Sequence, residues 1–343
     1  MLGIIFTIIG TFIGAGFSSG KEVYLFFYKY GIYGLFGIII SSFFISLIVK
    51  KTLIIIAKNN IKNYNNFLDL IIKNYLIKNV IKKTINFFLL ISFCVMISGF
   101  CEFLYQEFQV NKAITYIVIL FFCFYIFKKN INVIERINKI FIPFFIIFVL
   151  IFFIKNINYN YYFIENNLLK KVNNFDLNFI FFIKALLYSN YNLLVVIPII
   201  SCFYKSLKNN NIKYITLFVG IIIFVLSFII FCMLSQSNFL NIENISNYEM
   251  PIMCIVGKYG KLYRYVYSFI IAGSISTTAI SSGFSFLKEN TKNRVDYEKN
   301  ILYLILGSIV SIRVGFSRAI EIAYPVFGIV GIIQSFYILK LHK

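Results

Sequence analysis

Long apolar runs separated by short polar segments dominate the sequence. A helix that crosses a lipid bilayer needs about 20 predominantly apolar residues, and ten segments of the chain approach or exceed that length. These segments are residues 3–27, 32–56, 85–106, 113–128, 138–154, 179–204, 212–235, 262–287, 301–316 and 319–339. The pattern predicts an all-α integral membrane protein with about ten transmembrane helices in a single transmembrane domain, residues 1–343.

The composition agrees with a protein that contacts the lipid bilayer. Hydrophobic residues make up 60% of the chain and charged residues only 13%, whereas soluble domains carry about a quarter charged residues. The net charge of +20 comes from basic residues in short loops between apolar runs, which argues against a nucleic-acid partner. The oligomeric state does not follow from these features.

The distribution of the basic residues predicts the orientation in the membrane. Cytoplasmic loops of membrane proteins carry an excess of Lys and Arg. The loops after the second, fourth, sixth and eighth segments hold most of these residues here. We therefore expect a multi-pass membrane protein with both termini in the cytoplasm.

Residue types that carry catalysis or bind metals are scarce. His342 is the single histidine, and the six cysteines are scattered without a C-x-x-C motif. This pattern excludes histidine-based intramembrane chemistry and argues against a metal site. We expect no enzymatic activity and no cofactor.

Residues 10–22 interrupt the first apolar segment. Gly10, Gly14, Gly16 and Gly20 lie within it, and each glycine costs about 1 kcal/mol relative to alanine in a helix interior. A broken helix persists in lipid only where it is buried in protein or lines a cavity, and transporters build substrate sites at such breaks. The alternative is helix packing, because small residues four positions apart allow close approach. A dinucleotide-binding loop is excluded, since no strand precedes the glycines.

A second polar interruption lies five segments later. Residues 188–192 read Tyr-Ser-Asn-Tyr-Asn, and Pro198 follows. Ser and Asn side chains bond nearby backbone groups and favour helix ends. We therefore expect the sixth segment to be discontinuous as well. Interrupted helices at corresponding positions of two halves indicate a transporter site.

The eighth segment carries a row of hydroxyl side chains at helical spacing. Ser274, Thr277, Thr278, Ser281 and Ser285 share one face. Hydroxyl oxygens suit hard cations, but they also join helices at about 0.6 kcal/mol per hydrogen bond. Both interpretations remain open.

Two of the acidic residues in the apolar segments are candidates for a functional role. An acid at membrane depth is a functional hypothesis by default. Glu22 either faces a cavity or pairs with Lys21, and Glu102 is either functional or an interfacial residue at the outer rim. Both are candidate coupling or gating acids.

The sequence predicts local structure in two of the loops. The loop after the seventh segment contains apolar residues 248–253, which suggests an outer lid on the helix bundle. In the loop of residues 57–84, apolar side chains recur at helical spacing and predict a short surface helix. They are Ile61, Tyr64, Phe67, Leu68 and Ile71.

Four motifs, taken in order along the chain, resemble one family. Residues 14–22 are similar to the G-A-G-F-A-S-G-Q-E signature of YkvI-like bacterial membrane proteins, and residues 188–192, 249–251 and 324–328 resemble that family too. The family belongs with the amino acid–polyamine–organocation superfamily. The resemblance implies a LeuT-type fold with a 5+5 inverted repeat, of residues about 1–156 and about 178–340. Helices one and six would be discontinuous.

The resemblance also implies an ion site between segments one and eight. Its ligands would be the carbonyls of Gly10, Ile13 and Ser274 and the hydroxyls of Thr277 and Thr278. Some proton-coupled relatives use a lysine from segment five in place of sodium. Segment five has no interior lysine here, which favours sodium.

A substrate site next to the first break follows from the same resemblance. It would be formed by Gly14, Ala15, Gly16, Ser189, Asn190 and Asn192. The chain departs from the signature at Lys21, where the family has glutamine, and at Ser18, where it has alanine. The charge of Lys21 argues against a cationic substrate.

The sequence predicts a secondary active transporter, a sodium-coupled symporter of an amino acid or similar small zwitterion that works by alternating access. One alternative is a transporter of the same fold with proton coupling through Glu22 or Glu102. The other is a membrane sensor or scaffold that transports nothing.

Overall fold

A computed structural model describes residues 2–61, 63–128, 132–156, 179–201, 212–237, 240, 242, 244–291 and 294–341. These residues form helices and connecting turns, with no strand among them. The end of the predicted sixth segment, with Cys202, the loop that follows it up to residue 211, and His342 lie outside the described residues.

The apolar segments of the sequence coincide with the helices of the structure. The first segment forms three short helices, α1 (Leu2–Phe12), α2 (Ala15–Ser18) and α3 (Lys21–Phe26). The others are α4 (Ile32–Asn59), α5 (Tyr64–Ile71), α6 (Tyr75–Phe108), α7 (Lys112–Phe127), α8 (Asn132–Lys155), α10 (Ile180–Ser201), α12 (Ile212–Ser235), α13 (Pro251–Lys258), α14 (Lys261–Asn290), α15 (Arg294–Val314) and α16 (Phe316–Lys340). Single 3-10 turns lie at Tyr28–Tyr30 and Ile245–Asn247.

Several of these helices can cross a membrane. Among the described residues, six are long and apolar enough by length and composition, namely α4, α6, α10, α12, α14 and α16. Helix α7 and the part of α8 from Phe141 to Lys155 are shorter and also apolar. The all-α, multi-pass class is therefore confirmed, while ten crossings and the inverted repeat stay predictions.

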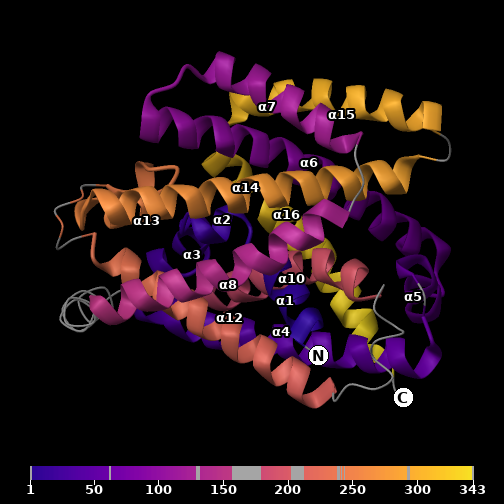
Figure 1. Ribbon diagram of the computed structural model, residues 1–343. Helices are drawn as coiled ribbons and strands as arrows, with labels where there is room; N and C mark the ends of the chain where they lie inside the picture. Colours follow the sequence, from indigo (N-terminus) through magenta and orange to yellow (C-terminus); the bar gives the residue numbers. More distant parts are fainter. Residues whose placement is uncertain are drawn as a thin grey trace.

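The long helices lie roughly side by side, with α1 and α10 in the interior. Helices α7 and α15 form the outermost layer on one side of α6, and α4 contacts α12 on the other side (Figure 1). Helix α10 packs against α16, α4 and α1. Both termini lie at one end of the molecule near α5, and α13 lies at the opposite end (Figure 1).

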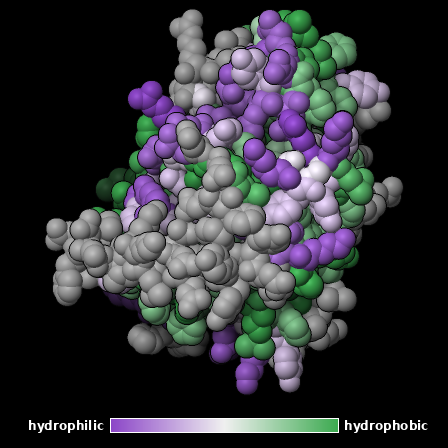
Figure 2. Space-filling model, turned by 90° about the vertical axis from the view of Figure 1, so that its left-hand side faces the viewer, coloured by the Kyte–Doolittle hydropathy of each residue, from purple (hydrophilic) through white to green (hydrophobic). Residues whose placement is uncertain are grey.

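Hydrophilic side chains gather at the end that carries α13, among the residues that the structure describes. Figure 2 looks onto this end, where hydrophilic side chains gather over the upper part of the face and hydrophobic ones lie mainly at its edges. This distribution fits helix ends that face water, surrounded by apolar sides that face lipid.

The predicted break in the first segment is confirmed. Helix α1 ends at Phe12, and the Gly14 amide donates to the Phe12 carbonyl at 2.9 Å rather than to Gly10, four residues back. Helix α2 starts at Ala15, and Gly20, with a φ of 82°, turns the chain into α3. Only glycine adopts that left-handed conformation without strain.

The prediction of a second broken helix is wrong. Helix α10 runs without interruption from Ile180 to Ser201. Its polar side chains donate to carbonyls one turn back: Ser189 Oγ to Ala185 at 2.7 Å and Asn190 Nδ2 to Leu186 at 2.8 Å. These bonds satisfy the polar groups inside a continuous helix, so no break is required.

The predicted surface helix is confirmed as α5. Asn63 caps its start by accepting from the Asn66 amide at 2.8 Å. Phe67, Leu68 and Ile71 are buried beneath it, as the helical spacing of these apolar residues indicates.

Candidate functional site

The break in the first segment packs against the hydroxyl face of α14. The Ser18 hydroxyl donates to the Ser274 hydroxyl at 2.8 Å, and the Tyr267 hydroxyl donates to the Ser18 carbonyl at 2.5 Å. The Thr278 hydroxyl oxygen lies 3.7 Å from the position that a Cβ would take on Gly14. The interrupted backbone is therefore buried against a polar row of another helix.

The residues proposed for an ion site meet in part at this contact. The hydroxyls of Thr277 and Thr278 both donate to the Ser274 carbonyl, at 3.1 and 2.8 Å. Each hydroxyl oxygen keeps its lone pairs for a cation. In a continuous helix the Gly14 amide would donate to the Gly10 carbonyl. Because it donates to Phe12 instead, the Gly10 carbonyl does not receive that hydrogen bond. Ile13 lies in the break itself.

Glu22 faces the protein interior at the same break. Its side chain is buried, and Oε2 accepts a hydrogen bond from the Tyr191 hydroxyl of α10. Its Oε1 occupies the space that a Cβ on Gly16 would need. The sequence left open whether Glu22 faces inward or pairs with Lys21. The structure supports the inward orientation, because Lys21 bonds to the loop and not to Glu22.

The Lys21 ammonium group binds the loop above the break. Its Nζ donates to the carbonyls of Ser246 at 2.7 Å and Tyr248 at 2.9 Å. These carbonyl contacts partly compensate a charge that is otherwise withdrawn from water. Lys21 therefore holds the loop and does not neutralise Glu22.

Aromatic rings surround the Glu22–Tyr191 pair. The Tyr191 ring centroid lies 4.7 Å from that of Tyr324 in α16 and 5.7 Å from that of Phe26 in α3. Tyr188, one turn earlier, lies 5.6 Å from Tyr191. The sequence reading missed Tyr191 and Tyr324, although both lie within family motifs, because it chose amide and serine side chains as ligands.

The substrate candidates in α10 are Ser189, Asn190 and Asn192. Their side chains bond to other helices or within α10, and not to the break. The Ser189 hydroxyl donates to the Ser41 carbonyl of α4 at 3.4 Å, and the side-chain Oδ1 of Asn190 accepts from the Ser335 hydroxyl of α16 at 2.5 Å. The Asn192 amide donates to Tyr188 within α10 at 3.0 Å. Gly14, Ala15 and Gly16, in contrast, lie at the break as expected.

Glu102 lies apart from the break, at the end of α6. It forms an ion pair with Lys112 of 2.6 Å, in which its side chain is 19% exposed and that of Lys112 38%. The Lys112 ammonium also lies 4.7 Å from the centre of the Tyr105 ring. This geometry supports the interfacial interpretation of Glu102.

The loop before α13 and the first turn of α13 pack onto the break, as the apolar residues 248–253 suggest. The amide of Ile252, in the first turn of α13, donates to the Ser19 carbonyl at 3.0 Å. Glu249 Oε2 accepts from both the amide, at 2.7 Å, and the hydroxyl of Ser317 in the first turn of α16. The loop thus joins segment one to α16.

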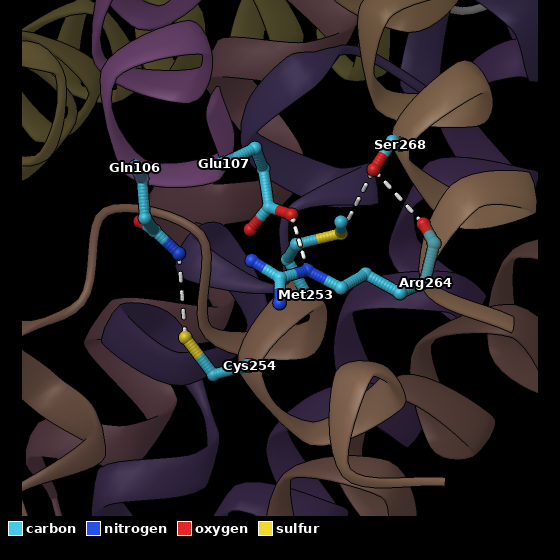
Figure 3. Close-up of polar contacts among 6 residues, drawn as sticks. All are labelled: Gln106, Glu107, Met253, Cys254, Arg264 and Ser268. Atoms are coloured by element: carbon cyan, nitrogen blue, oxygen red, sulfur yellow. Dashed lines mark hydrogen bonds and ion pairs between the residues drawn. The ribbon is translucent and has the colours of Figure 1, made fainter. Parts of the chain in front are cut away.

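A second set of contacts lies between α6, α13 and α14 (Figure 3). The Gln106 amide of α6 donates to the Cys254 sulfur of α13 at 3.3 Å, and Arg264 Nε of α14 donates to Glu107 of α6 at 2.7 Å. Figure 3 shows these side chains converging from the end of α6, from α13 and from the start of α14. Helix α13 is therefore bonded to α6 as well as to segment one.

An apolar cavity of about 240 Å³ also lies between α6, α7 and α14, bordered by the exposed side chains of Val118 and Phe122. Its walls include Ile97, Val118, Ile275 and Ala279. Because it is lined almost wholly by apolar side chains, it offers no polar recognition of the kind present at the break. Among the described residues, no group of three or more His, Cys, Asp or Glu is placed to hold a metal ion.

The long apolar helices and the buried, interrupted first segment define a multi-pass helical membrane protein. The chain is 22% identical over 330 residues to the uncharacterized membrane protein YkvI of Bacillus subtilis (strain 168), which covers 95% of this chain and 92% of that protein. No family model matches the chain. Similarity along nearly the whole length supports the resemblance to YkvI-like membrane proteins.

Proposed function

We propose that the protein is a secondary active transporter that works by alternating access, with its substrate site at the break in segment one. The observation that carries this proposal is the burial of the break against the α14 hydroxyls and against Tyr191 of α10. A helix that only anchors the chain in lipid has no need of such an interruption. The proposal involves no covalent chemistry and no cofactor.

The proposed substrate is an amino acid or a similar small zwitterion bound beside Gly14, Ala15 and Gly16. The interruption frees backbone amides and carbonyls, which recognise a carboxylate and an ammonium group respectively. Tyr191 is a further contact in this proposal, because it reaches the break from α10, whereas Ser189 and Asn190 bond to α4 and α16.

Sodium is the first candidate for the coupling ion. The carbonyls of Gly10, Ile13 and Ser274 and the hydroxyls of Thr277 and Thr278 would supply five oxygen ligands, the type that hard cations prefer. The proximity of Thr278 to Gly14, the residue after Ile13, supports this assignment.

A proton on Glu22 is the second candidate. Withdrawing an ionised carboxylate from water costs several kcal/mol unless it is compensated. In the structure, Glu22 has the Tyr191 hydroxyl as a partner, and the neighbouring Lys21 bonds to the loop carbonyls. A carboxyl group so placed is suited to bind a proton in one state and release it in another.

We also propose that the protein resides in the bacterial cytoplasmic membrane with both termini in the cytoplasm. The lysine-rich loops of the sequence support this orientation. The positions of both termini at one end of the molecule (Figure 1) are consistent with it.

Uptake into liposomes tests the proposal. Purified protein would be reconstituted and offered a panel of labelled amino acids under a sodium gradient, a pH gradient or neither. Uptake driven by sodium supports the first candidate, and uptake driven by the pH gradient alone selects Glu22. Binding can also be measured as a rise in the unfolding temperature, because a ligand at a hundred times its Kd stabilises a protein by about 2.7 kcal/mol. If no compound is taken up and none raises the unfolding temperature, the sensor or scaffold alternative replaces transport.

A further inference from the structure

Helix α5 and the start of α6 present a surface that the proposed transport does not use. We propose that this surface, formed by Lys73, Tyr75, Leu76, Val80 and Lys83 and called here the α5–α6 surface, binds the headgroups of anionic phospholipids. It lies at the end of the molecule that carries both termini (Figure 1).

The length of α6 places this surface at the depth of the headgroups. Helix α6 has 34 residues, which span about 51 Å at 1.5 Å per residue, whereas the hydrocarbon core is about 30 Å thick. The apolar segment predicted from the sequence starts at residue 85. Residues 75–84 therefore extend about 15 Å beyond the hydrocarbon, into the interfacial region.

The exposed side chains on this extension are apolar. Tyr75 is 70% exposed, Leu76 72% and Val80 55%. Leu76, Val80 and Lys83 follow each other at helical spacing on one face. Apolar side chains next to lysines are typical of elements that insert into the boundary between headgroups and acyl chains, and tyrosine favours the same depth.

The charge of the surface is positive. Lys73 and Lys83 are exposed. Asp69 of α5 is paired with Lys78 at 2.6 Å, and the hydrogen bond from Lys78 lowers the pKa of Asp69. Asp69 therefore stays ionised at neutral pH and pairs with Lys78, with Lys82 also close enough to lower its pKa. Lys73 and Lys83 lie outside this group and attract phosphate groups.

Lipid binding here would be transmitted to the helix bundle. Gln334 Nε2 of α16 donates to the Tyr64 hydroxyl of α5 at 3.0 Å, and Phe67 is fully buried under α5. A ligand that holds the α5–α6 surface in its native position stabilises the folded state. The unfolding temperature is therefore a suitable measurement, and it needs no transport.

The test compares the protein in nanodiscs of phosphatidylcholine with nanodiscs that also contain phosphatidylglycerol. We expect phosphatidylglycerol to raise the unfolding temperature and the double variant Lys73→Gln/Lys83→Gln to lose at least half of that rise. The matched control is Lys258→Gln/Lys261→Gln, which removes two exposed lysines from the opposite end and should keep the rise. High salt should reduce the effect, because it screens exposed charges.

The variant Asp69→Asn should change the rise of the unfolding temperature with phosphatidylglycerol in the opposite direction. It releases Lys78 from its ion pair, so the rise with phosphatidylglycerol should increase. Equal losses in the two double variants, or no dependence on the headgroup in the unmodified protein, would overturn the proposal. An equal rise with soluble glycerol phosphate in detergent would also overturn it, since the ligand would then be a free phosphate ester.

Discussion

The carboxylate of Glu22 lies directly on the backbone of Gly16, with one oxygen in the space that a Cβ at position 16 would need. Its other oxygen accepts the hydrogen bond of Tyr191. The break, the acid and helix α10 therefore form one structural unit. Glycine is required at position 16 because the acid of the same segment folds back onto it.

Gly16→Ala should destabilise the protein. Alanine normally stabilises a helical position relative to glycine by about 1 kcal/mol, but here its methyl group overlaps Glu22, and overpacking costs about 1–3 kcal/mol. We expect a lower unfolding temperature and reduced uptake. The control is Gly307→Ala in α15, where no atom lies within 4 Å of the added carbon.

A double variant separates this clash from other effects. Glu22→Ala removes the overlapping carboxylate, so adding Gly16→Ala to it should cost much less than adding Gly16→Ala to the natural sequence. Contacting residues show such coupling in double-mutant cycles. Strictly additive unfolding free energies would contradict the contact.

Tyr191→Phe should weaken the packing of α10 on segment one. It removes the hydroxyl that donates to Glu22, and a buried acceptor left without its partner costs about 1–3 kcal/mol. Uptake and stability should both fall. Tyr116→Phe, which removes a hydroxyl bonded to Ser308 at 2.8 Å away from the break, should leave uptake nearly intact. Equal uptake in both variants would argue against a role for Tyr191 in the site.

Thr277→Ala should weaken the dependence of uptake or stability on sodium while the protein remains folded. The change deletes one proposed oxygen ligand of the ion. Ser276→Ala is the neighbouring control, since its hydroxyl bonds the Ala272 carbonyl at 2.7 Å and its side chain borders the apolar cavity. The measurement is the unfolding temperature as a function of sodium concentration against potassium. An unchanged sodium response would remove Thr277 from the site.

Glu249→Ala should loosen the loop over the break. The variant leaves the Ser317 amide without its carboxylate partner, and loss of such a contact at the start of a helix costs about 0.5–2 kcal/mol. We expect faster proteolysis in the loop of residues 236–250. Glu298→Gln, on the exposed surface of α15, should leave the cleavage rate unchanged. If the Glu249 variant is also cut at the natural rate, the carboxylate does not hold the loop.

The sequence predicts the helices and the first break well, because both depend on local properties. Apolar length predicts the long helices, and four glycines predict the interruption of segment one. The sequence fails at α10 for a physical reason: Ser189 and Asn190 bond the carbonyl one turn back as readily as they cap a helix end. Composition alone does not separate these outcomes.

The partner of Glu22 could not be predicted from the sequence. Neighbouring positions in a helix point about 100° apart, so the rotation of α10 decides which side chain of the motif reaches the break. Tertiary packing orients Tyr191 toward Glu22 and Asn190 toward Ser335. The sequence of residues 188–192 alone does not show which of these side chains reaches the break.

The continuity of α10 has a mechanical consequence. Segment one can bend at residues 13–14, whereas α10 is continuous and Ser189 and Asn190 bond carbonyls one turn back within it. The outer part of segment one is also tied to the first turn of α13 through Ser19 and to the loop before α13 through Lys21. A rearrangement around the break would therefore move the outer part of segment one and the loop together, as one unit, relative to the continuous helix α10.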